Sequence, residues 1–151
     1  MSNKIQINIR AEGQKDLDVI SSLIQDATVR VGDLAYDRNS HQFACLANRF
    51  RWENKEVERE ERIRSILRFE HVLKTVYKNI PLKKTNHTLN LLSLDCVEGE
   101  DFEKTIIFVF SGFASIKIKV ECIEVFLKDL TKPWKTNNKP EHSITQDLEK
   151  N

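Results

Sequence analysis

The chain has 151 residues, of which 31% are charged and 40% hydrophobic, and its formal net charge is +1. At this length about 68–70% of the unfolded surface can be buried, which predicts a single domain with one core. A charge so near zero gives no global field for polyanions, so a nucleic-acid site would depend on local clustering. We expect the domain to span residues 1–142 and residues 143–151 to form a flexible polar tail.

The first third of the chain predicts a strand, a helix and a hairpin. Residues 5–9, IQINI, alternate apolar and polar side chains, the period of a half-buried strand. An amphipathic helix is predicted to begin near residue 15, with acids in its first turn and an apolar face of Leu17, Ile20, Leu23, Ile24 and Ala27. Two β-rich runs then flank the turn-forming segment DRNSHQ, and Gly32 in the first run indicates a bulge or a close backbone approach.

The middle of the chain predicts further strands. The run IRSILRFEHVLKTVY, residues 63–77, fits one strand with Ile63, Leu67, Phe69, Leu73 and Tyr77 on one face, and a helix is the less favoured alternative. LNLLSLDCV is a further strand. TIIFVFSG is almost continuously apolar, which predicts burial on both faces, whereas SIKIKVE alternates and should have one face in water.

The segment CIEVFLKDLTKPW, residues 122–134, satisfies both the strand period and the helix period. The helical pattern extends further, so we favour a C-terminal helix that ends at Pro133 and is anchored by Trp134. The fold class is therefore α+β: one N-terminal helix plus a bent, mainly antiparallel sheet or partly closed barrel. A pleckstrin-homology-like barrel with a C-terminal helix is one arrangement of most of these elements.

The stretch RFRWENKEVEREERIR, residues 49–64, contains eleven charged residues in sixteen positions. Six basic residues oppose five glutamates, and nearby carboxylates weaken phosphate binding. Strand alternation would place Phe50 and Trp52 in the core and leave the arginines in water, which favours a solvated hairpin. The alternative is a binding surface formed by Arg49, Arg51, Trp52, Arg62 and Arg64, and the burial of Trp52 discriminates between the two.

No motif predicts catalysis, a metal site or a cofactor. His41, His71, His87 and His142 are scattered without ligand spacing, and the four glycines stand apart from one another. Asp33 and Glu53 could meet across the hairpin, but adjacent Glu70 and His71 should point to opposite faces, with the imidazole inside. The cysteines Cys45, Cys96 and Cys122 lie in apolar contexts and are predicted to be buried, reduced thiols.

Three segments, VISSLIQDATVRVGDLAY, NRFRWE and VECIEVFLKDLTKPW, occur in an order that resembles an alphaproteobacterial family of uncharacterised proteins, domain of unknown function number 2948. The similarity covers about residues 5–142, and the connection IPLKKTNHT is where the chain departs from it. The resemblance implies a bacterial cytoplasmic protein and carries over no catalytic residue.

A protein-interaction or scaffold module is the function that these patterns favour, with an unknown protein partner or a second copy of the chain as its ligand. RNA or single-strand binding through the arginine-rich hairpin is the alternative, although nucleic acid is not the expected partner. The N-terminus lacks the long apolar run of a signal peptide, and no window is apolar enough for a membrane span. We therefore expect a cytoplasmic protein that uses no membrane and no cofactor.

Overall fold

The computed structural model describes residues 6–53, 61–99 and 103–135. These residues form one α-helix, one 3-10 turn and eleven strands that belong to a single sheet. The elements are β1 Asn8–Ala11, α1 Gln14–Leu23, β2 Thr28–Arg30, the 3-10 turn Val31–Asp33, β3 Leu34–Asp37, β4 Gln42–Phe50, β5 Glu61–Phe69, β6 Val72–Lys78, β7 Thr88–Glu98, β8 Lys104–Phe110, β9 Ala114–Val120, β10 Val125–Asp129 and β11 Trp134–Lys135.

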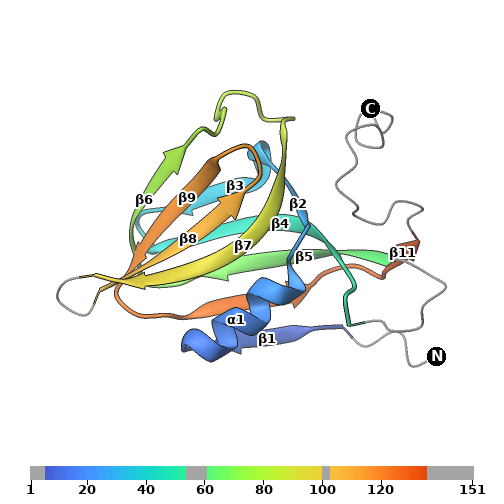
Figure 1. Ribbon diagram of the computed structural model, residues 1–151, viewed down its shortest axis with the longest axis horizontal. Coiled ribbons are helices and arrows are strands. Elements are labelled where there is room, and N and C mark those ends of the chain that lie inside the picture. Colours follow the sequence, from blue (N-terminus) through green and yellow to red (C-terminus); the bar gives the residue numbers. More distant parts are fainter. Residues whose placement is uncertain (1–5, 54–60, 100–102, 136–151) are drawn as a thin grey trace.

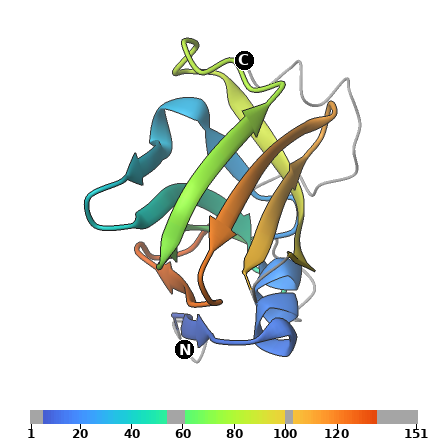
Figure 2. The same ribbon diagram turned by 90° about the vertical axis from the view of Figure 1, so that its left-hand side faces the viewer.

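The sheet is antiparallel throughout and strongly bent (Figures 1 and 2). Its strand order is β1-β10-β5-β4-β2-β7-β8-β9-β6, with β3 added beside β4 and β11 beside β5. The short strand β2 joins the two halves, since Thr28 pairs with both Asn48 of β4 and Asn90 of β7. The open ends of the order are β1 and β6. The expected bent antiparallel sheet is thus confirmed.

The helix α1 forms where the apolar spacing predicted it. Gly13 caps its N-terminus in an extended conformation, Asp16 lies in the first turn, and Leu17 and Ile20 are buried. The helix packs against β1 and β7, and the hydroxyl of Ser21 accepts a hydrogen bond of 3.0 Å from the backbone of Leu94. Figure 1 shows α1 between β1 and β7, and its buried residues Leu17 and Ile20 belong to the hydrophobic core.

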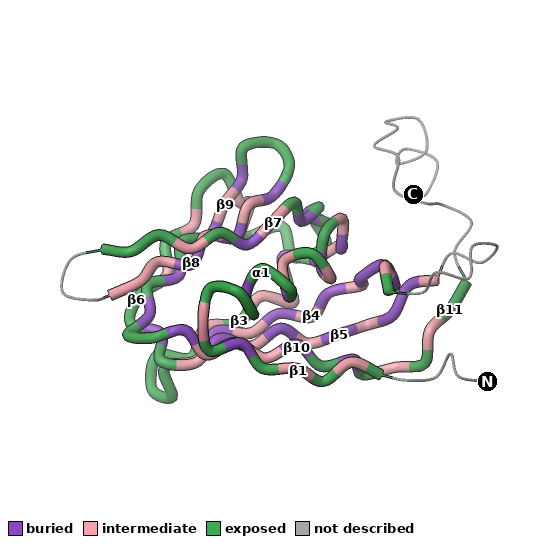
Figure 3. The backbone as a smooth tube through the Cα atoms, turned by 60° about the horizontal axis from the view of Figure 1, so that its bottom comes forward, coloured by how far each residue is buried: buried purple, intermediate pink, exposed green. Residues whose placement is uncertain are grey.

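Aromatic side chains from both halves of the sheet form the centre of the core. Phe108 of β8 contacts Phe43 of β4 and Phe69 of β5 edge to face, with ring centroids 6.3 and 5.4 Å apart. Phe110 stacks on Phe108 at 5.2 Å. Such pairs add to the free energy gained from burying their area. Figure 3 shows the alternation of buried and less buried residues along the strands that this core requires.

Three predictions from the sequence, two about strands and one about a helix, are wrong. Residues 63–77 form two strands rather than one, because the chain turns between Phe69 and Val72, where His71 has a positive φ of 57°. Leu73 is exposed and lies at a register shift between Val72 and Lys74. Residues 125–129 form strand β10 instead of a helix, since β1 and β5 pair with its two sides. Strand β8 is fully buried on one face only: Ile107 and Val109 on the other face are half-buried.

The C-terminal region therefore differs from the expectation. Trp134, predicted to anchor a helix in the core, lies on β11 beside Arg62 and is 40% exposed. The pleckstrin-homology-like arrangement is not confirmed, since the segment assigned to its helix is a strand. The predicted tail, residues 143–151, lies outside the described residues. No helix among the described residues is long and apolar enough to cross a membrane.

Candidate functional site

The arginine-rich stretch is drawn largely into the protein. Arg49 is 0% exposed, and Arg51 and Arg62 are also buried, while Arg64 and Trp52 are half-buried. The prediction that the arginines remain in water is therefore wrong for Arg49, Arg51 and Arg62. Strand alternation did not predict this because Arg49 and its neighbour Phe50 are both buried, on opposite faces of β4.

Arg49 lies in a network of ion pairs rather than on a binding surface. Its guanidinium donates to Asp129 at 2.9 and 2.8 Å and to Glu53 at 2.9 and 2.7 Å. Asp129 also accepts hydrogen bonds from the Ser65 hydroxyl and, at 2.8 Å, from the backbone N–H of Ile7. Burial acts to raise the pKa of Asp129, but these donors together hold it below its ordinary value.

Arg51 and Trp52 also have partners inside the protein. Arg51 pairs with Glu61 at 2.5 Å, and the Trp52 ring contacts Phe50 edge to face at 5.0 Å between centroids. The Trp52 indole N–H donates to the backbone oxygen of Gln25 at 2.8 Å. These contacts favour a structural role for the aromatic residues. Residues 54–60 of the stretch lie outside the described residues.

Arg62 contacts two residues of the neighbouring strand β4. Its guanidinium lies 5.2 Å from the centroid of the Phe50 ring and donates to the backbone oxygen of Asn48 at 2.9 Å. Burial lowers the pKa of Arg62, and the charge of Asp26 partly opposes that effect. Arg64, two residues further along β5, donates from Nε to the side-chain oxygen of Asn48 at 3.2 Å.

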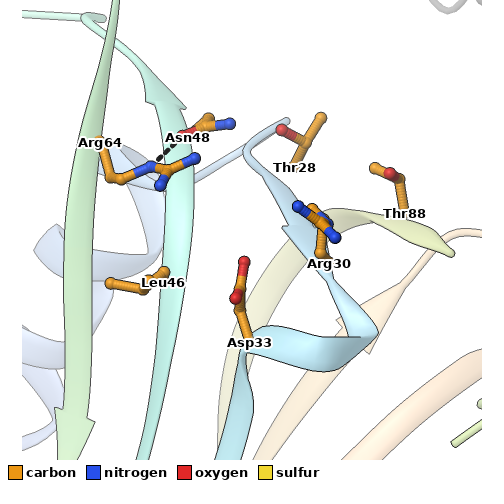
Figure 4. Close-up of a pocket in the computed structure, with 7 residues that line it drawn as sticks. All are labelled: Thr28, Arg30, Asp33, Leu46, Asn48, Arg64 and Thr88. Atoms are coloured by element: carbon orange, nitrogen blue, oxygen red, sulfur yellow. Dashed lines mark hydrogen bonds between the residues drawn. The ribbon is translucent and has the colours of Figure 1, made fainter. Parts of the chain in front are cut away.

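Arg64 is the predicted site residue that lines the pocket of Figure 4. The cavity has a volume of about 110 Å³ and lies over β2, β4, β5 and β7. It is lined by Thr28, Arg30, Asp33, Leu46, Asn48, Arg64 and Thr88. Both signs of charge and several neutral hydrogen-bonding groups therefore face one small space.

The 3-10 turn between β2 and β3 places Asp33 in this pocket. The backbone N–H groups of Val31 and Gly32 donate to the carbonyls of His87 and Thr85, each at 2.9 Å. A Cβ atom at Gly32 would lie only 3.0 Å from the Thr85 oxygen. The close backbone approach predicted at Gly32 is thus confirmed. Asp33 does not share a site with Glu53, which pairs with Arg49 instead.

Sequence reasoning missed most of the pocket because its residues are spread over about sixty positions. Arg30, Asp33 and Thr88 belong to no motif and come together only when β2 pairs with both β4 and β7. Gly32 was the one available signal, since a glycine that requires close packing often adjoins a positioned side chain. Nothing in the sequence linked it to Arg64.

A second candidate surface lies at β6, the last described strand of the sheet order (Figure 2). We call the residues Leu73, Lys74, Val76, Lys78 and Phe113 the β6 edge surface. Leu73 and Val76 are exposed, and Phe113, in the turn between β8 and β9, is 91% exposed. Phe113 has a φ of 61°, and its carbonyl accepts a 2.9 Å hydrogen bond from the Asn79 side chain at the end of β6. Val72 at the start of β6 is hydrogen-bonded to His41, and among the described strands none but β9 pairs with the rest of β6. Apolar and cationic groups therefore meet along the part of this edge that follows Val72.

The histidines come together at no metal site in the described residues: no group of three or more His, Cys, Asp or Glu side chains is close enough to hold an ion. His71 is exposed, and its Nε2 lies 2.9 Å from Oε1 of Glu124, so its predicted inward orientation is wrong. Glu70 instead accepts hydrogen bonds from Gln42 and Arg68. His142 lies outside the described residues.

The three cysteines differ in exposure, contrary to the prediction that all are buried. Cys45 is buried, Cys96 is half-buried and Cys122 is exposed. Burial, reinforced by the charge of Asp33, raises the pKa of Cys45 to about 12. Cys45 is therefore protonated near neutral pH and a poor nucleophile.

The described chain is a one-helix, antiparallel-sheet protein of the α+β class, with a small polar pocket and an open edge. It belongs to the family described as "Protein of unknown function (DUF2948)", whose model matches residues 7–142. No curated protein matches the chain. No solved structure matches it either.

Proposed function

We propose that this protein is a non-catalytic protein-interaction module of the bacterial cytoplasm, and that it binds its partner at the β6 edge surface. The observation that carries the proposal is the end position of β6, which among the described strands pairs with β9 alone. An edge strand presents unpaired N–H and C=O groups that can hydrogen-bond an added strand.

The side chains around β6 support protein contact. Val76 stands beside Lys117 and Lys74 beside Lys119 in the register with β9, so apolar and cationic groups share the outer face. Phe113, beside Asn79 at the end of β6, offers a large exposed apolar side chain. Exposed aromatic side chains are frequent anchors of protein interfaces. Lysines on an edge also prevent self-association, which favours a different protein over a second copy of this chain.

The burial of Arg49, Arg51 and Arg62 argues against the alternative function, nucleic-acid binding by the arginine-rich hairpin. These side chains have carboxylate, carbonyl or ring partners inside the protein. Moving them to a phosphate would leave those partners unpaired. Trp52, whose exposure was the discriminating feature, is half-buried and hydrogen-bonded to Gln25.

The test is purification of the tagged chain from its own cell under native conditions, followed by mass spectrometry of the bound proteins. The variants are Val76→Thr and Phe113→Ser, and the matched control is Val19→Ser on α1, whose side chain is comparably exposed to that of Val76. We expect a stoichiometric partner that survives nuclease treatment, is lost with both variants and is retained by the control. Equal recovery by all variants, or loss on nuclease treatment, would contradict the proposal.

Light scattering of the purified chain distinguishes a different protein from a second copy of the chain as the partner. A monomer at working concentration agrees with a different protein as partner. A dimer that Phe113→Ser dissociates would assign the surface to a second copy of the chain, whereas a dimer unaffected by that change would place self-association elsewhere.

A further inference from the structure

The pocket beside β2 holds charges of both signs that do not pair with one another. Arg64 donates from Nε to Asn48, and Arg30 donates to the side-chain oxygen of Asn86 at 2.6 Å. Within the described residues, Asp33 forms no ion pair or side-chain hydrogen bond with either arginine. Figure 4 shows the Asp33 carboxylate pointing toward the space between the two arginine side chains. The pocket thus keeps acceptors and donors that remain available to a ligand.

We propose that this pocket binds a small zwitterion of the α-amino acid type, with its carboxylate at Arg30 and Arg64 and its ammonium at Asp33. A guanidinium has a planar fork of donors that matches a carboxylate. The carboxylate of Asp33 can accept hydrogen bonds from the ligand's ammonium group. The inference concerns a different part of the molecule from the β6 edge surface and does not depend on the proposed function.

Ligands of a single charge fit the pocket less well. A simple anion attracted by the two arginines would also be repelled by Asp33 at short range. A simple cation attracted by Asp33 would meet two guanidinium groups. Only a molecule that carries both charges close together satisfies both sides. The neutral groups of Thr28, Asn48 and Thr88 can add hydrogen bonds to either end.

The volume of the pocket limits the size of the ligand. A cavity of about 110 Å³ corresponds to the space of roughly three to four water molecules at ~30 Å³ each. That space suits a molecule of a few heavy atoms and is well below the ~300 Å³ at which pockets for larger ligands begin. Leu46 provides an apolar wall for a small side chain. We therefore expect a small amino acid such as glycine to fill the pocket.

Strands and a hydrogen-bonded turn hold the backbone of the charged residues in place before any ligand arrives. Arg64 projects from the centre of β5, between β4 and β10, and Arg30 projects from β2. The two backbone hydrogen bonds from the turn to Thr85 and His87 fix the position of Asp33. A site that is ordered in advance loses less entropy on binding.

The experiment is a titration of the full, isotope-labelled chain followed by nuclear magnetic resonance, with glycine, acetate and methylammonium as separate probes. The signals to follow are the backbone amides of Thr28, Asp33 and Asn48 and the side-chain Nε–H of Arg30 and Arg64. We expect glycine to shift these signals saturably and to bind at least about tenfold more tightly than acetate or methylammonium, the factor that one charge-assisted hydrogen bond supplies.

Variants of the charged residues test which side chain binds which end of glycine. Asp33→Asn keeps the shape of the side chain and removes its charge, so glycine should bind at least about tenfold more weakly while acetate binds more tightly. Arg64→Gln should weaken both. The matched control is Asp95→Asn on the exposed face of β7, which should change neither affinity. The amide spectrum of each variant shows whether it is folded, and Arg30→Gln replaces Arg64→Gln if the latter is not.

Three results would overturn the proposal. The first is the absence of saturable shifts at the pocket signals with glycine. The second is equal affinity of the parent for glycine and acetate. The third is an Asp33→Asn protein in which the preference for glycine over acetate is unchanged. A rotation of Arg30 or Arg64 to pair with Asp33 in solution would fill the pocket and produce the first of these results.

Discussion

Arg49 and Asp129 meet inside the sheet through hydrogen bonds of 2.9 and 2.8 Å, although 80 residues separate them in the chain. Both side chains are 0% exposed. Arg49 lies on β4 and Asp129 on β10, and β5 runs between them with Ser65 donating to the same carboxylate. The pair therefore connects three neighbouring strands through side chains as well as through the backbone.

Asp129→Ala should lower the free energy of unfolding by about 3–5 kcal/mol, because it leaves the buried guanidinium of Arg49 without one of its two carboxylates. Urea denaturation measures the effect. Asp95→Ala, at an exposed position of β7, is the control and should change stability little. The double variant Arg49→Met, Asp129→Leu should be more stable than Asp129→Ala alone. A single variant as stable as the parent would show that Arg49 finds other partners.

The same carboxylates should make stability depend on acid pH. Hydrogen bonds and the charge of Arg49 outweigh burial and hold the pKa values of Asp129 and Glu53 below their ordinary values. The unfolded chain, with Asp near ~3.9 and Glu near ~4.3, then binds more protons than the native protein in mildly acid solution. Stability contributed by these groups is complete above about pH 5 and is lost as pH falls through the folded pKa values.

Urea titrations from pH 7 down to pH 3 measure this dependence. The parent should lose unfolding free energy steadily below about pH 5, and the Arg49→Met, Asp129→Leu variant should lose less over the same range. Parallel curves for the two proteins would assign the acid sensitivity to other carboxylates.

Much of the fold follows from local periodicity. The apolar spacing from Leu17 predicted α1, and the alternation in SIKIKVE predicted β9 with one face in water. The failures lie where tertiary pairing decides. β10 has a sequence compatible with a helix, but its position between β1 and β5 imposes the strand. The positive φ of His71 is similarly invisible to a periodicity count.

The site was less predictable than the fold for a related reason. A charged run normally indicates a solvated surface. Arg49 can nevertheless be buried, because the distant residue Asp129 and Glu53 both form ion pairs with it. The pocket depends on a strand of three residues, β2, that pairs on both sides. Contacts between such separate segments leave no spacing pattern in a single sequence.

The three thiols should react in the order of their exposure. Cys122, which is exposed, should react first with a thiol reagent, Cys96 more slowly, and Cys45 only in denaturant, where its raised pKa and burial are both removed. Single Cys→Ser variants assign each phase of a colour-forming thiol titration. Rapid modification of Cys45 in the native protein would mean that β3 and β4 open readily, since Cys45 pairs with Leu34 between them.

Gly32→Ala should destabilise the protein by about 1–3 kcal/mol, the usual cost of inserting an atom into a packed region. The added Cβ would lie 3.0 Å from the Thr85 oxygen and 3.1 Å from the Thr85 Cβ. Thr85 and His87, in the loop of residues 80–87, accept the backbone hydrogen bonds that position Asp33. Displacement of this loop should therefore also shift the amide signals of Arg30 and Asp33. Gly99→Ala is the matched control, because its Cβ would lie 3.6 Å from the nearest atom, the Glu103 oxygen, which is an ordinary contact distance. Urea denaturation and amide spectra of both variants test the prediction. A Gly32→Ala protein with the parent's stability and pocket signals would show that the loop of residues 80–87 yields without cost, and that the position of Asp33 does not depend on this close approach.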